Sequence, residues 1–400
     1  MKPFFESVFN FDKEVSNMAI IALDGAKELG AKVDYYLVNL YNNDIKKYNK
    51  NVPEKKTFLL NNVCPRFTTG DGKGMINDTI RGKDLFILVD VGNYSKTYNM
   101  FGVLNRMSPD DYYADLKRII SAAGGKAKSM TVVMPSLYGG RQHRRNARES
   151  LDCAQMLREL ETMGVSGVIT FDAHDPRVQN AVPLMGFDNF LPTYQILKAL
   201  LKAYPEVNID KNNFMVVSPD EGAMGRNIYY ASVLGIDLGM FYKRRDTSTV
   251  VNGRNPIVAH EYIGNDVRDK DIFVADDIIA TGDSMLKLCT ELKERGCGKI
   301  FLTATYALFT EGVEKFEKAY KDGLFTAVLS TNLTYTPEEV KSRPWFVQAD
   351  LSKFMAYIIA AVDQNKSLST LLDPHDKIKE LIEKFNQNKP QQLTFDVDEE

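Results

Sequence analysis

Short apolar runs alternate with segments of helical periodicity along most of this chain. The runs LFILVDV (85–91) and SMTVVMP (129–135) are continuously apolar, as is typical of strands that are covered on both faces. Between them, residues 109–123 place Tyr113 and Leu116 on one helical face, which predicts a helix. The same alternation continues through FMVVSPDEG, DIFVADD and KIFLTATYALF. The pattern predicts an α/β chain built on mostly parallel sheets.

The alternation is interrupted near residues 187–189, within AVPLMGFDNFLP, which predicts a domain break. We predict an N-terminal α/β domain over 1–187, a C-terminal α/β domain over 188–350, and a helical C-terminal segment with an acidic tail over 351–400. The residues after Phe385 are polar and acidic, as is typical of a frayed tail. In parallel sheets, ligands bind beyond the carboxyl ends of the strands. Polar clusters at those ends are therefore the candidate sites.

The composition is that of an ordinary globular protein. The chain has 400 residues, of which 44% are hydrophobic and 26% charged, so it can bury the cores of two or three domains. A formal net charge of -3 gives no reason to expect nucleic acid as the main partner. No apolar run reaches the roughly 18 residues that a membrane span needs. The first residues, MKPFFESVFNFDKE, lack the basic start and the long apolar core of a signal peptide. The four cysteines show no paired spacing, which suits a reducing compartment. We therefore predict a soluble cytoplasmic protein with no membrane partner.

The run VADDIIATGDS (274–284) places two acids side by side at the end of an apolar stretch. A strand is predicted to end at Asp276 and Asp277. Because successive strand side chains point to opposite faces, the two acids need not face each other, and one or both can project at a ligand beyond the strand. The alternative is that both acids are simply solvated.

The residues after these acids are small or hydroxylated. Gly282 permits a tight turn, and a helix is predicted to begin near Ser284. Backbone amides at a helix start, together with the hydroxyl of Thr281 or Ser284, would suit a phosphate. The acids can bind the hydroxyls of a sugar and the amides can bind a phosphate, so together they indicate a sugar-phosphate site. The spacing also allows that Asp283 or Ser284 only caps the helix.

The run MPSLYGGRQHRRNARES carries arginines around His143, after a predicted strand and before a predicted helix. Cations near a helix N-terminus oppose its dipole, which favours an anion or an acidic partner nearby. Arginine also forks onto phosphate and stacks on flat rings. A solvated basic face is the alternative, and we keep only Arg141 with Gln142 as candidates. The cluster comprises Arg141, Arg144, Arg145 and Arg148.

Two more predicted strands end in acids. In TFDAHD, His174 stands two residues after Asp172, and this setting favours magnesium or phosphate over a structural histidine. The spacing is not that of a zinc site. In VVSPDEGAMGRN, Asp220 is followed by a glycine-bearing turn. It is either a ligand for a hard cation or the cap of the next helix.

Cations follow the strand predicted for IDLGMFYKRR. Lys243, Arg244 and Arg245 precede a polar stretch that predicts a mobile loop. Cations on such a loop could close over a transferring phosphoryl group, and a charged surface loop is the alternative. The glycine-rich stretch CPRFTTGDGKG is weak evidence alone, and the chain contains no Walker A sequence.

In their order along the chain, these clusters resemble the ribose-phosphate diphosphokinase family, over about residues 66–360. The 274–284 run also resembles the phosphoribosyl loop of the phosphoribosyltransferase fold. The matching motifs are RF-x-x-G-acid at 66–71, RQ at 141–142, D-x-H at 172–174, SPD at 218–220, KRR at 243–245 and DDII at 276–279. This order is a specific signal. The resemblance implies two similar phosphoribosyltransferase-type domains, each a mostly parallel sheet flanked by helices.

The resemblance implies transfer of the β,γ-diphosphoryl group of ATP to the C1 hydroxyl of ribose 5-phosphate, giving phosphoribosyl diphosphate and AMP. It also implies Mg2+ as the cofactor and a homo-oligomer whose ATP sites are shared between subunits. Lys243 and Arg245 would stabilise the charge on the transferred group. Phe67 would pack on adenine.

The same resemblance implies three sets of binding residues. Those for ATP are Phe67, Gly70 and Asp71 from a neighbouring subunit, and Arg141 and Gln142 from the same subunit. Those for the metal are His174, Asp220 and Asp172. Those for ribose 5-phosphate are Asp276, Asp277, Ala280, Thr281, Gly282, Asp283 and Ser284.

The chain departs from the family's pattern at four positions. His143 replaces the acid of RQD, Ala280 replaces an aspartate after DDII, Asp283 replaces a loop glycine, and Thr69 replaces an acid of the ATP loop. Two alternatives remain: a catalytically weak relative that regulates an active synthetase, which would explain these changes, and a phosphoribosyltransferase that consumes phosphoribosyl diphosphate, which would explain the DDII run. The retained cations and metal-type residues argue against the first. Phe67, the Arg141–Gln142 pair and His174 argue against the phosphoribosyltransferase, because they would have no role in an enzyme that does not bind ATP.

Overall fold

The computed structural model describes residues 9, 16–48, 52–145, 147–245 and 257–395, without the side chains at 48, 243–245, 257–260 and 388–395. Contacts divide the chain into two compact units. Unit 1 takes in Met1–Pro192, Asn332–Tyr335 and Asp350–Asp373, and unit 2 takes in Thr193–Thr331, Thr336–Ala349 and Pro374–Glu400.

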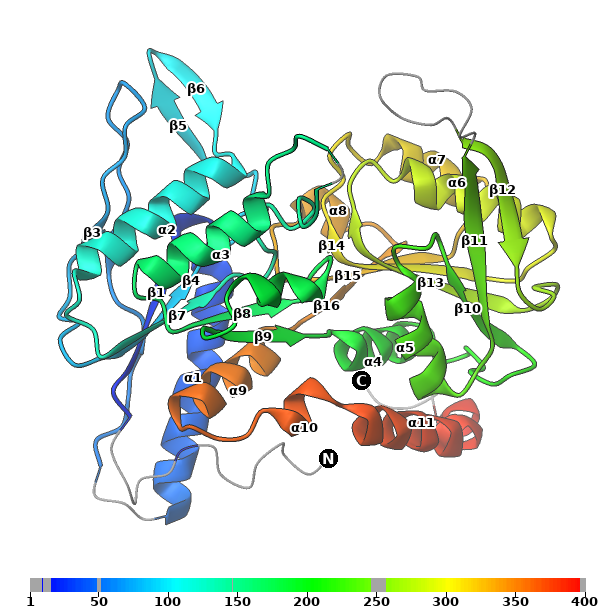
Figure 1. The fold of residues 1–400 in the computed structure, drawn as a ribbon. Helices are drawn as coiled ribbons and strands as arrows, with labels where there is room; N and C mark the ends of the chain where they lie inside the picture. Colours follow the sequence, from blue (N-terminus) through cyan, green and yellow to red (C-terminus); the bar gives the residue numbers. More distant parts are fainter. Residues whose placement is uncertain (1–8, 10–15, 49–51, 146, 246–256, 396–400) are drawn as a thin grey trace. The chain divides into compact units, whose positions relative to one another are not determined.

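Unit 1 is built on a parallel sheet with the strand order β1-β4-β7-β8-β9 (Figure 1). The inner strands are buried on both faces, which explains their continuously apolar sequences. The sheet comprises β1 (Met18–Ala22), β4 (Asp84–Leu88), β7 (Ser129–Val133), β8 (Gly167–Phe171) and β9 (Gly186–Phe190). Two short antiparallel pairs are β2 (Asn62–Val63) with β3 (Met75–Ile76), and β5 (Thr97–Met100) with β6 (Val103–Arg106).

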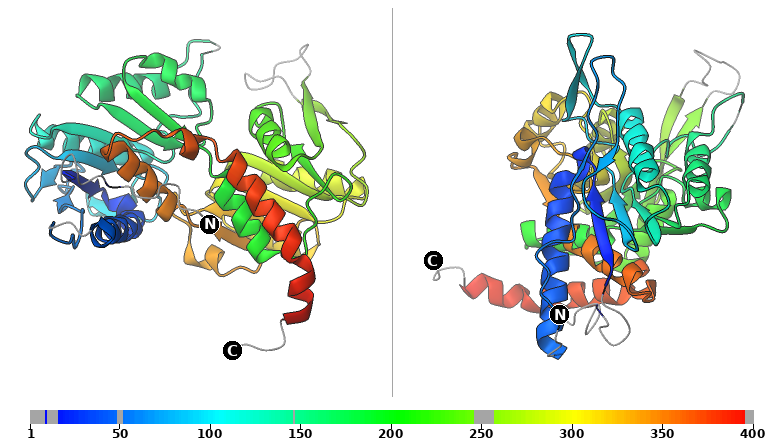
Figure 2. Two further views of the ribbon diagram at one scale, coloured as in Figure 1. Left: turned by 90° about the horizontal axis from the view of Figure 1, so that it is seen from below. Right: turned by 90° about the vertical axis from the view of Figure 1, so that its left-hand side faces the viewer.

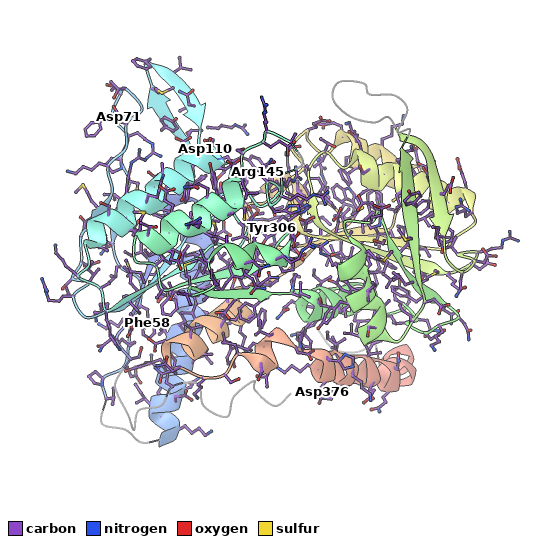
Figure 3. All side chains as sticks on the ribbon, viewed as in Figure 1. Phe58, Asp71, Asp110, Arg145, Tyr306 and Asp376 are labelled. Carbon is purple, nitrogen blue, oxygen red and sulfur yellow. The ribbon has the colours of Figure 1, made fainter. Side chains whose placement is uncertain are left out.

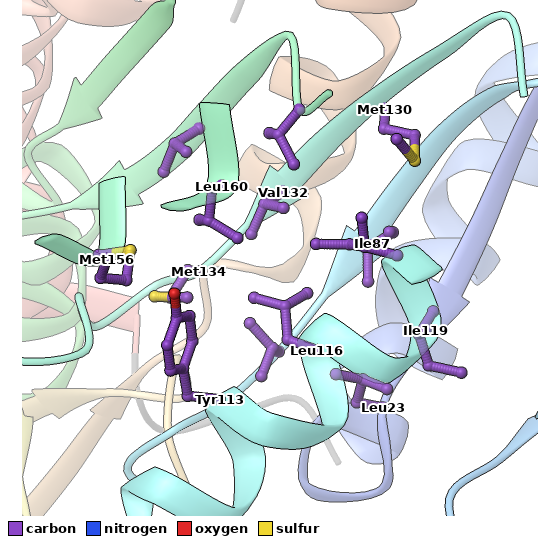
Figure 4. Close-up of a cluster of buried hydrophobic side chains, with 14 of the residues drawn as sticks. Leu23, Ile87, Tyr113, Leu116, Ile119, Met130, Val132, Met134, Met156 and Leu160 are labelled. Carbon is purple, nitrogen blue, oxygen red and sulfur yellow. The ribbon is translucent and has the colours of Figure 1, made fainter. Parts of the chain in front are cut away.

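Helices cover both faces of this sheet. Figure 4 shows Tyr113, Leu116 and Ile119 of α2 packed with Val132 of β7 and Leu160 of α3. On the other face, α1 packs against α9 (Figure 1). The helical elements of unit 1 are η1 (Asp24–Ala26), α1 (Lys27–Tyr48), α2 (Pro109–Ala123), α3 (Asp152–Thr162), η2 (Pro176–Ala181), α9 (Ser352–Asp363) and α10 (Ser369–Leu372).

The limits of α2 follow from local sequence. The Ser108 side chain accepts from the amide of Asp111, and the Asp111 side chain accepts from the amide of Ser108, which is a capping box. At the other end, Gly124 adopts the left-handed conformation (φ 54°) that closes many helices. The helix predicted over 109–123 is therefore confirmed.

Asp90 joins a segment distant in the sequence to unit 1. It follows β4, and its side chain is buried. The Thr334 hydroxyl donates to Oδ1 at 2.9 Å, the Tyr335 amide donates to Oδ2 at 3.1 Å, and the Gly92 amide donates to Oδ1 at 3.0 Å. Burial nevertheless raises the pKa of Asp90 to about 7.

Unit 2 is built on a sheet with the order β12-β11-β10-β13-β14-β15-β16, parallel except for the edge pair of β11 with β12. Strand β14 is buried along its whole length, at the centre of this unit's core. The strands are β10 (Phe214–Ser218), β11 (Leu238–Arg245), β12 (Ile257–Ile263), β13 (Asp271–Ile279), β14 (Ile300–Ala307), β15 (Ala327–Thr331) and β16 (Phe346–Ala349).

The helices of unit 2 also lie on both faces of its sheet (Figure 1). Helices α4 and α5 pack on one face with α11 beside them, as the left view of Figure 2 shows. On the other face, Met285, Leu288 and Phe316 of α6 and α7 enter the core. These helices are α4 (Thr193–Ala203), α5 (Met224–Leu234), α6 (Asp283–Glu294), α7 (Glu314–Lys321), α8 (Glu338–Lys341) and α11 (His375–Phe395).

The C-terminal segment is shared between the units. Asp350–Asp373 belongs to unit 1, because α9 packs on α1, and Pro374–Glu400 belongs to unit 2, because α11 packs on α4 and α5. Unit 2 begins at Thr193, whereas we placed the domain limit at 187. Helix α11 also continues to Phe395, past the point where the composition predicts a frayed tail.

The fold class predicted from the sequence is confirmed: each unit is a mostly parallel sheet flanked by helices. All four cysteines are free thiols. Within the described ranges, no helix is both long and apolar enough to cross a membrane.

Candidate active site

The two adjacent acids lie inside β13 and not at its end. The strand continues to Ile279 because its backbone pairs with β14 as far as Ala307. The strand end that we predicted at Asp276 and Asp277 is therefore wrong. Asp277 is 7% exposed, whereas the Asp276 side chain is 28% exposed. The difference is expected of neighbouring side chains on opposite faces of a sheet.

Helix α5 places a cation beside the first acid. The side chain of Asn227 donates to the carbonyl of Ala275 at 2.8 Å and accepts from its amide at 3.1 Å, which fixes α5 against β13. One residue earlier, Arg226 brings Nη1 to 3.6 Å from Asp276 Oδ1. Burial, and then the charge of Asp277, raise the pKa of Asp276, and Arg226 opposes both effects. We did not single out Arg226 from the sequence, although a cation in the first turn of a helix is the signal that we applied to the arginine cluster.

A left-handed glycine shapes the turn after β13. Gly282 has φ 84° and ψ -7°, and α6 begins at Asp283, one residue before the predicted start. A Cβ at Gly282 would lie 2.3 Å from Cζ of Phe316, so the turn has no room for a side chain there. The amide of Thr310 donates to the Ala280 carbonyl at 3.0 Å and holds the turn in place.

The negative charge of Asp283 is offset by Lys315 of α7. Lys315 Nζ lies 2.8 Å from Asp283 Oδ1, and the Thr281 hydroxyl donates to Oδ2 at 3.2 Å. The hydrogen bond from Lys315, and then that from Thr281, lower the pKa of Asp283. The acid that departs from the family's glycine therefore stands beside a cation. Nothing in the local sequence pairs these two residues, because they lie on different helices.

Asp220 caps the start of α5. Its Oδ1 accepts from the amides of Gly222 at 3.0 Å and Ala223 at 3.2 Å, while the Ser218 hydroxyl donates to its carbonyl. This geometry agrees with the capping alternative for Asp220. It also places the carboxylate at the helix that carries Arg226.

Lys243 and Arg245 lie at the end of β11, as predicted. Their side chains, and the predicted mobile loop at 246–256, lie outside the described residues. The backbone alone is described for the predicted catalytic pair.

In unit 1, the loop of Phe67, Gly70 and Asp71 is a tight turn anchored by a buried arginine. The Phe67 amide donates to the Asp71 carbonyl at 2.8 Å, and Gly70 adopts φ 94°. Thr69, which replaces an acid, donates from its hydroxyl to Asp71 Oδ2 at 2.8 Å. Arg66 donates to both oxygens of Asp115 on α2, at 2.7 and 2.9 Å.

The tip of this loop presents apolar surface. Phe67 is 58% exposed, and the amide of Phe101 at the tip of the β5–β6 hairpin donates to the Thr68 carbonyl at 2.8 Å. Phe101 and Leu104 of the same hairpin are also largely exposed. Figure 3 labels Asp71 in this loop, beside the hairpin. The sequence did not predict the hairpin.

Arg141 and Gln142 lie in the loop between β7 and α3, where Figure 3 labels Arg145. Arg141 is exposed. The Gln142 amide donates to the Gly139 carbonyl at 2.8 Å, and its side chain donates to the Ser150 carbonyl at 3.2 Å. Gln142 therefore closes the loop on itself.

Asp172 and His174 follow β8 in the same unit. Asp172 is buried and has φ 46°, a conformation that is unfavourable for a non-glycine residue and is found disproportionately at active sites. The ring centroid of His174 lies 5.2 Å from that of His143. Asp175, one residue further on, has its pKa lowered to about 2, mainly by its hydrogen bond from Arg177. In the described part of the chain, no group of three or more His, Cys, Asp and Glu side chains is placed to hold a metal ion.

The predicted residues divide between the two units. Unit 1 contains the loop of Phe67, the Arg141–Gln142 pair and the Asp172–His174 pair. Unit 2 contains Asp220 and the ribose-phosphate set from Asp276 to Ser284.

Both halves of the chain match known sequence families. The N-terminal domain of ribose phosphate pyrophosphokinase matches residues 18–164, and the phosphoribosyl transferase domain matches residues 188–341. The chain belongs to the ribose-phosphate pyrophosphokinase family. The resemblance drawn from the ordered motifs is thereby confirmed.

Relatives within this pyrophosphokinase family match most of the chain. Ribose-phosphate pyrophosphokinase of Vibrio cholerae is 28% identical over 318 residues, which are 77% of this chain and 90% of the relative. The enzyme of Pasteurella multocida is 29% identical over 76% of this chain and 89% of its own length. In fold, the chain is similar to phosphoribosylpyrophosphate synthetase from Mycobacterium smegmatis, with a TM-score of 0.68 at 19% identity, over 87% of this chain and 99% of that one.

Proposed function

We propose that this chain is a ribose-phosphate diphosphokinase that forms phosphoribosyl diphosphate and AMP from ATP and ribose 5-phosphate. The supporting observation is that the N-terminal half matches the N-terminal domain of ribose phosphate pyrophosphokinase, and the C-terminal half matches the phosphoribosyl transferase domain. In the reaction, the C1 oxygen of the sugar attacks the β phosphorus of ATP. The bond from that phosphorus to the α,β-bridging oxygen breaks, AMP leaves, and the hydroxyl proton passes to solvent.

Unit 2 binds ribose 5-phosphate in this proposal. Asp276 and Asp277 accept hydrogen bonds from ribose hydroxyls, and the turn over Ala280, Thr281, Gly282, Asp283 and Ser284 holds the 5-phosphate. The left-handed turn at the start of α6 supports this role, because helix N-termini bind phosphate through backbone amides. Lys315 offsets the charge of Asp283 at that turn.

Unit 1 binds ATP. Arg141 and Gln142 contact the nucleotide of their own subunit, while Phe67, Gly70 and Asp71 serve the ATP of a neighbouring subunit in a homo-oligomer. The exposure of Phe67 supports the shared site, because a ring that is 58% exposed is available to stack on a base brought by another copy.

Mg2+ is the proposed cofactor, and its proposed ligands are Asp172 and His174 in unit 1 and, separately, Asp220 in unit 2. Carboxylate oxygens suit this ion, which keeps most of its coordination for water and substrate phosphates. When bound, it neutralises charge on the ATP phosphates. Lys243 and Arg245 stabilise the charge that develops on the transferred group, since phosphoryl transfer depends on positioning and electrostatics. The predicted cytoplasmic location stays a prediction.

The deciding measurement is AMP release from ATP and magnesium in three reactions. One contains ribose 5-phosphate, one contains ribose without the phosphate, and one contains no sugar. We expect AMP only with ribose 5-phosphate, in equal amount to phosphoribosyl diphosphate. No AMP in any reaction would contradict the proposal. The two alternatives would then be tested by consumption of phosphoribosyl diphosphate with a base, and by the effect of the chain on an active synthetase.

Gly282→Ala should raise the KM for ribose 5-phosphate about tenfold or more, because a displaced turn no longer matches the phosphate. The new Cβ would meet the Phe316 ring, and φ 84° disfavours any side chain. Gly225→Ala on α5 is the matched control, since a Cβ there meets nothing within 4 Å. Equal KM values for the two variants would argue against a phosphate at this turn.

A further inference from the structure

The structure brings a carboxylate to the position where the family's motif has lost one. His143 replaces the acid of RQD, and its Nε2 lies 3.5 Å from Asp175 Oδ2. The side chains of His143 and Asp175 are only 13% and 11% exposed. Because both side chains are nearly buried, solvent competes little with this contact between the two loops.

Asp175 is held in place independently of His143. Arg177 donates to it from Nη2 at 2.6 Å and from Nε at 2.9 Å, and the Arg177 amide donates to Oδ1 at 2.9 Å. These bonds cap η2 and fix the carboxylate at the end of β8. The loop of Gln142 is closed by hydrogen bonds to Gly139 and Ser150 within itself, and Tyr138 at its start donates to Asp110 of α2 at 2.6 Å. The contact between His143 and Asp175 therefore ties this loop to a fixed point on another element.

The other nitrogen of His143 supports a place at a ligand site. Nδ1 is buried and has no hydrogen-bond partner in the described structure. A buried polar atom without a hydrogen-bond partner destabilises the folded chain, and it needs an explanation in a native protein. The neighbouring Arg141–Gln142 pair, and His174 at a ring distance of 5.2 Å, place this nitrogen among the residues assigned to ATP and its metal.

We propose that Asp175 is a positioning residue for ATP, which clamps His143, and with it Arg141 and Gln142, to the end of β8. It supplies from position 175 the carboxylate that the third position of the motif lacks. This inference rests on the proposed function. It assigns a role to a residue outside the family's motifs and explains why His143 is compatible with activity.

The test uses the full chain and moves the carboxylate between the two positions. Asp175→Asn and His143→Gln should each raise the KM for ATP about tenfold, which corresponds to about 1.4 kcal/mol and is a usual coupling for residues in contact. The kcat and the KM for ribose 5-phosphate should stay within about twofold of the wild type. His143→Asp alone places two carboxylates beside each other, and it should raise the KM for ATP more than either of these variants does. The double variant His143→Asp/Asp175→Asn returns the acid to the motif and should recover the KM for ATP to within about threefold. Asp210→Asn makes the same chemical change in a turn of unit 2 and is the matched control.

A second readout needs no activity. Arg144 and Arg145 are exposed in the clamped loop, so the rate of tryptic cleavage after them reports how firmly the loop is held. Cleavage should be faster in Asp175→Asn and His143→Gln, and slow again in the double variant. A double variant no better than His143→Asp, or unchanged cleavage in the single variants, would overturn the clamp. If the wild type releases no AMP, the proposed function fails, while the cleavage rates still decide the clamp.

Discussion

Replacing Arg66 by alanine should lower the free energy of unfolding by about 3 kcal/mol, at the lower end of what breaking a buried ion pair costs. Arg66 and Asp115 have side chains only 6% and 4% exposed, and Arg66 donates to both carboxylate oxygens. The variant leaves Asp115 buried with Arg118 as a partner at 2.8 Å, which moderates the loss. Arg66 also lies over the Tyr98 ring, so packing is lost with the charge. Urea unfolding followed by circular dichroism measures the change.

Lys32→Ala is the control for this prediction. Lys32 pairs with Glu28 one helical turn away, with side chains 44% and 68% exposed. Such surface pairs contribute about 0.3–0.5 kcal/mol. Similar losses in the two variants would mean that burial does not decide the strength of the pair. Because Arg66 anchors the loop of Phe67, we also expect its variant to bind ATP more weakly at temperatures where it is still folded.

Asp90 should make stability depend on pH in the direction opposite to most carboxyls. Burial raises its pKa from the ordinary 3.8 to about 7. Between these values the folded chain keeps the proton while the unfolded chain has lost it. Stability from this group is therefore present below about pH 4 and is lost as the pH rises through about 7. A shift of this size corresponds to about 4 kcal/mol.

The comparison of wild type with Asp90→Asn isolates this effect. The amide does not titrate, so the advantage of the wild type over the variant should shrink by about 4 kcal/mol between pH 4 and pH 8. The variant also loses an acceptor for Thr334, Tyr335 or Gly92, which lowers its stability at every pH. Unfolding midpoints in urea at several pH values measure both the pH-dependent change and the loss that is the same at every pH. Parallel pH profiles would show that Asp90 stays ionised in the folded chain.

These two residues serve the same purpose in unit 1. Arg66 fixes a loop that carries the exposed Phe67, and Asp90 fixes Asn332–Tyr335, which lies 244 residues away at Thr334. Buried ionisable groups with several hydrogen bonds thus hold irregular segments that contribute little apolar surface of their own. The loss of either residue should therefore lower stability, and the loss of Arg66 should also weaken ATP binding.

The sequence by itself determined the elements whose causes are local. The capping box at Ser108 and the glycine at 124 set both ends of α2, and continuous apolar runs indicated parallel strands buried on both faces. The order of the motifs identified the family, since each motif is a short contiguous run. In these cases the interacting groups are a few residues apart, and the sequence displays them directly.

Only the tertiary structure decided the contacts between distant segments. Strand β13 runs past Asp277 because β14 continues beside it, and Lys315 reaches Asp283 from another helix. Arg226 meets Asp276, and Asp175 meets His143, in the same way. Each of these pairings depends on how strands and helices stack. The sequence supplied the charges, but the charge balance at the site arose only when the chain folded and brought them within a few ångströms.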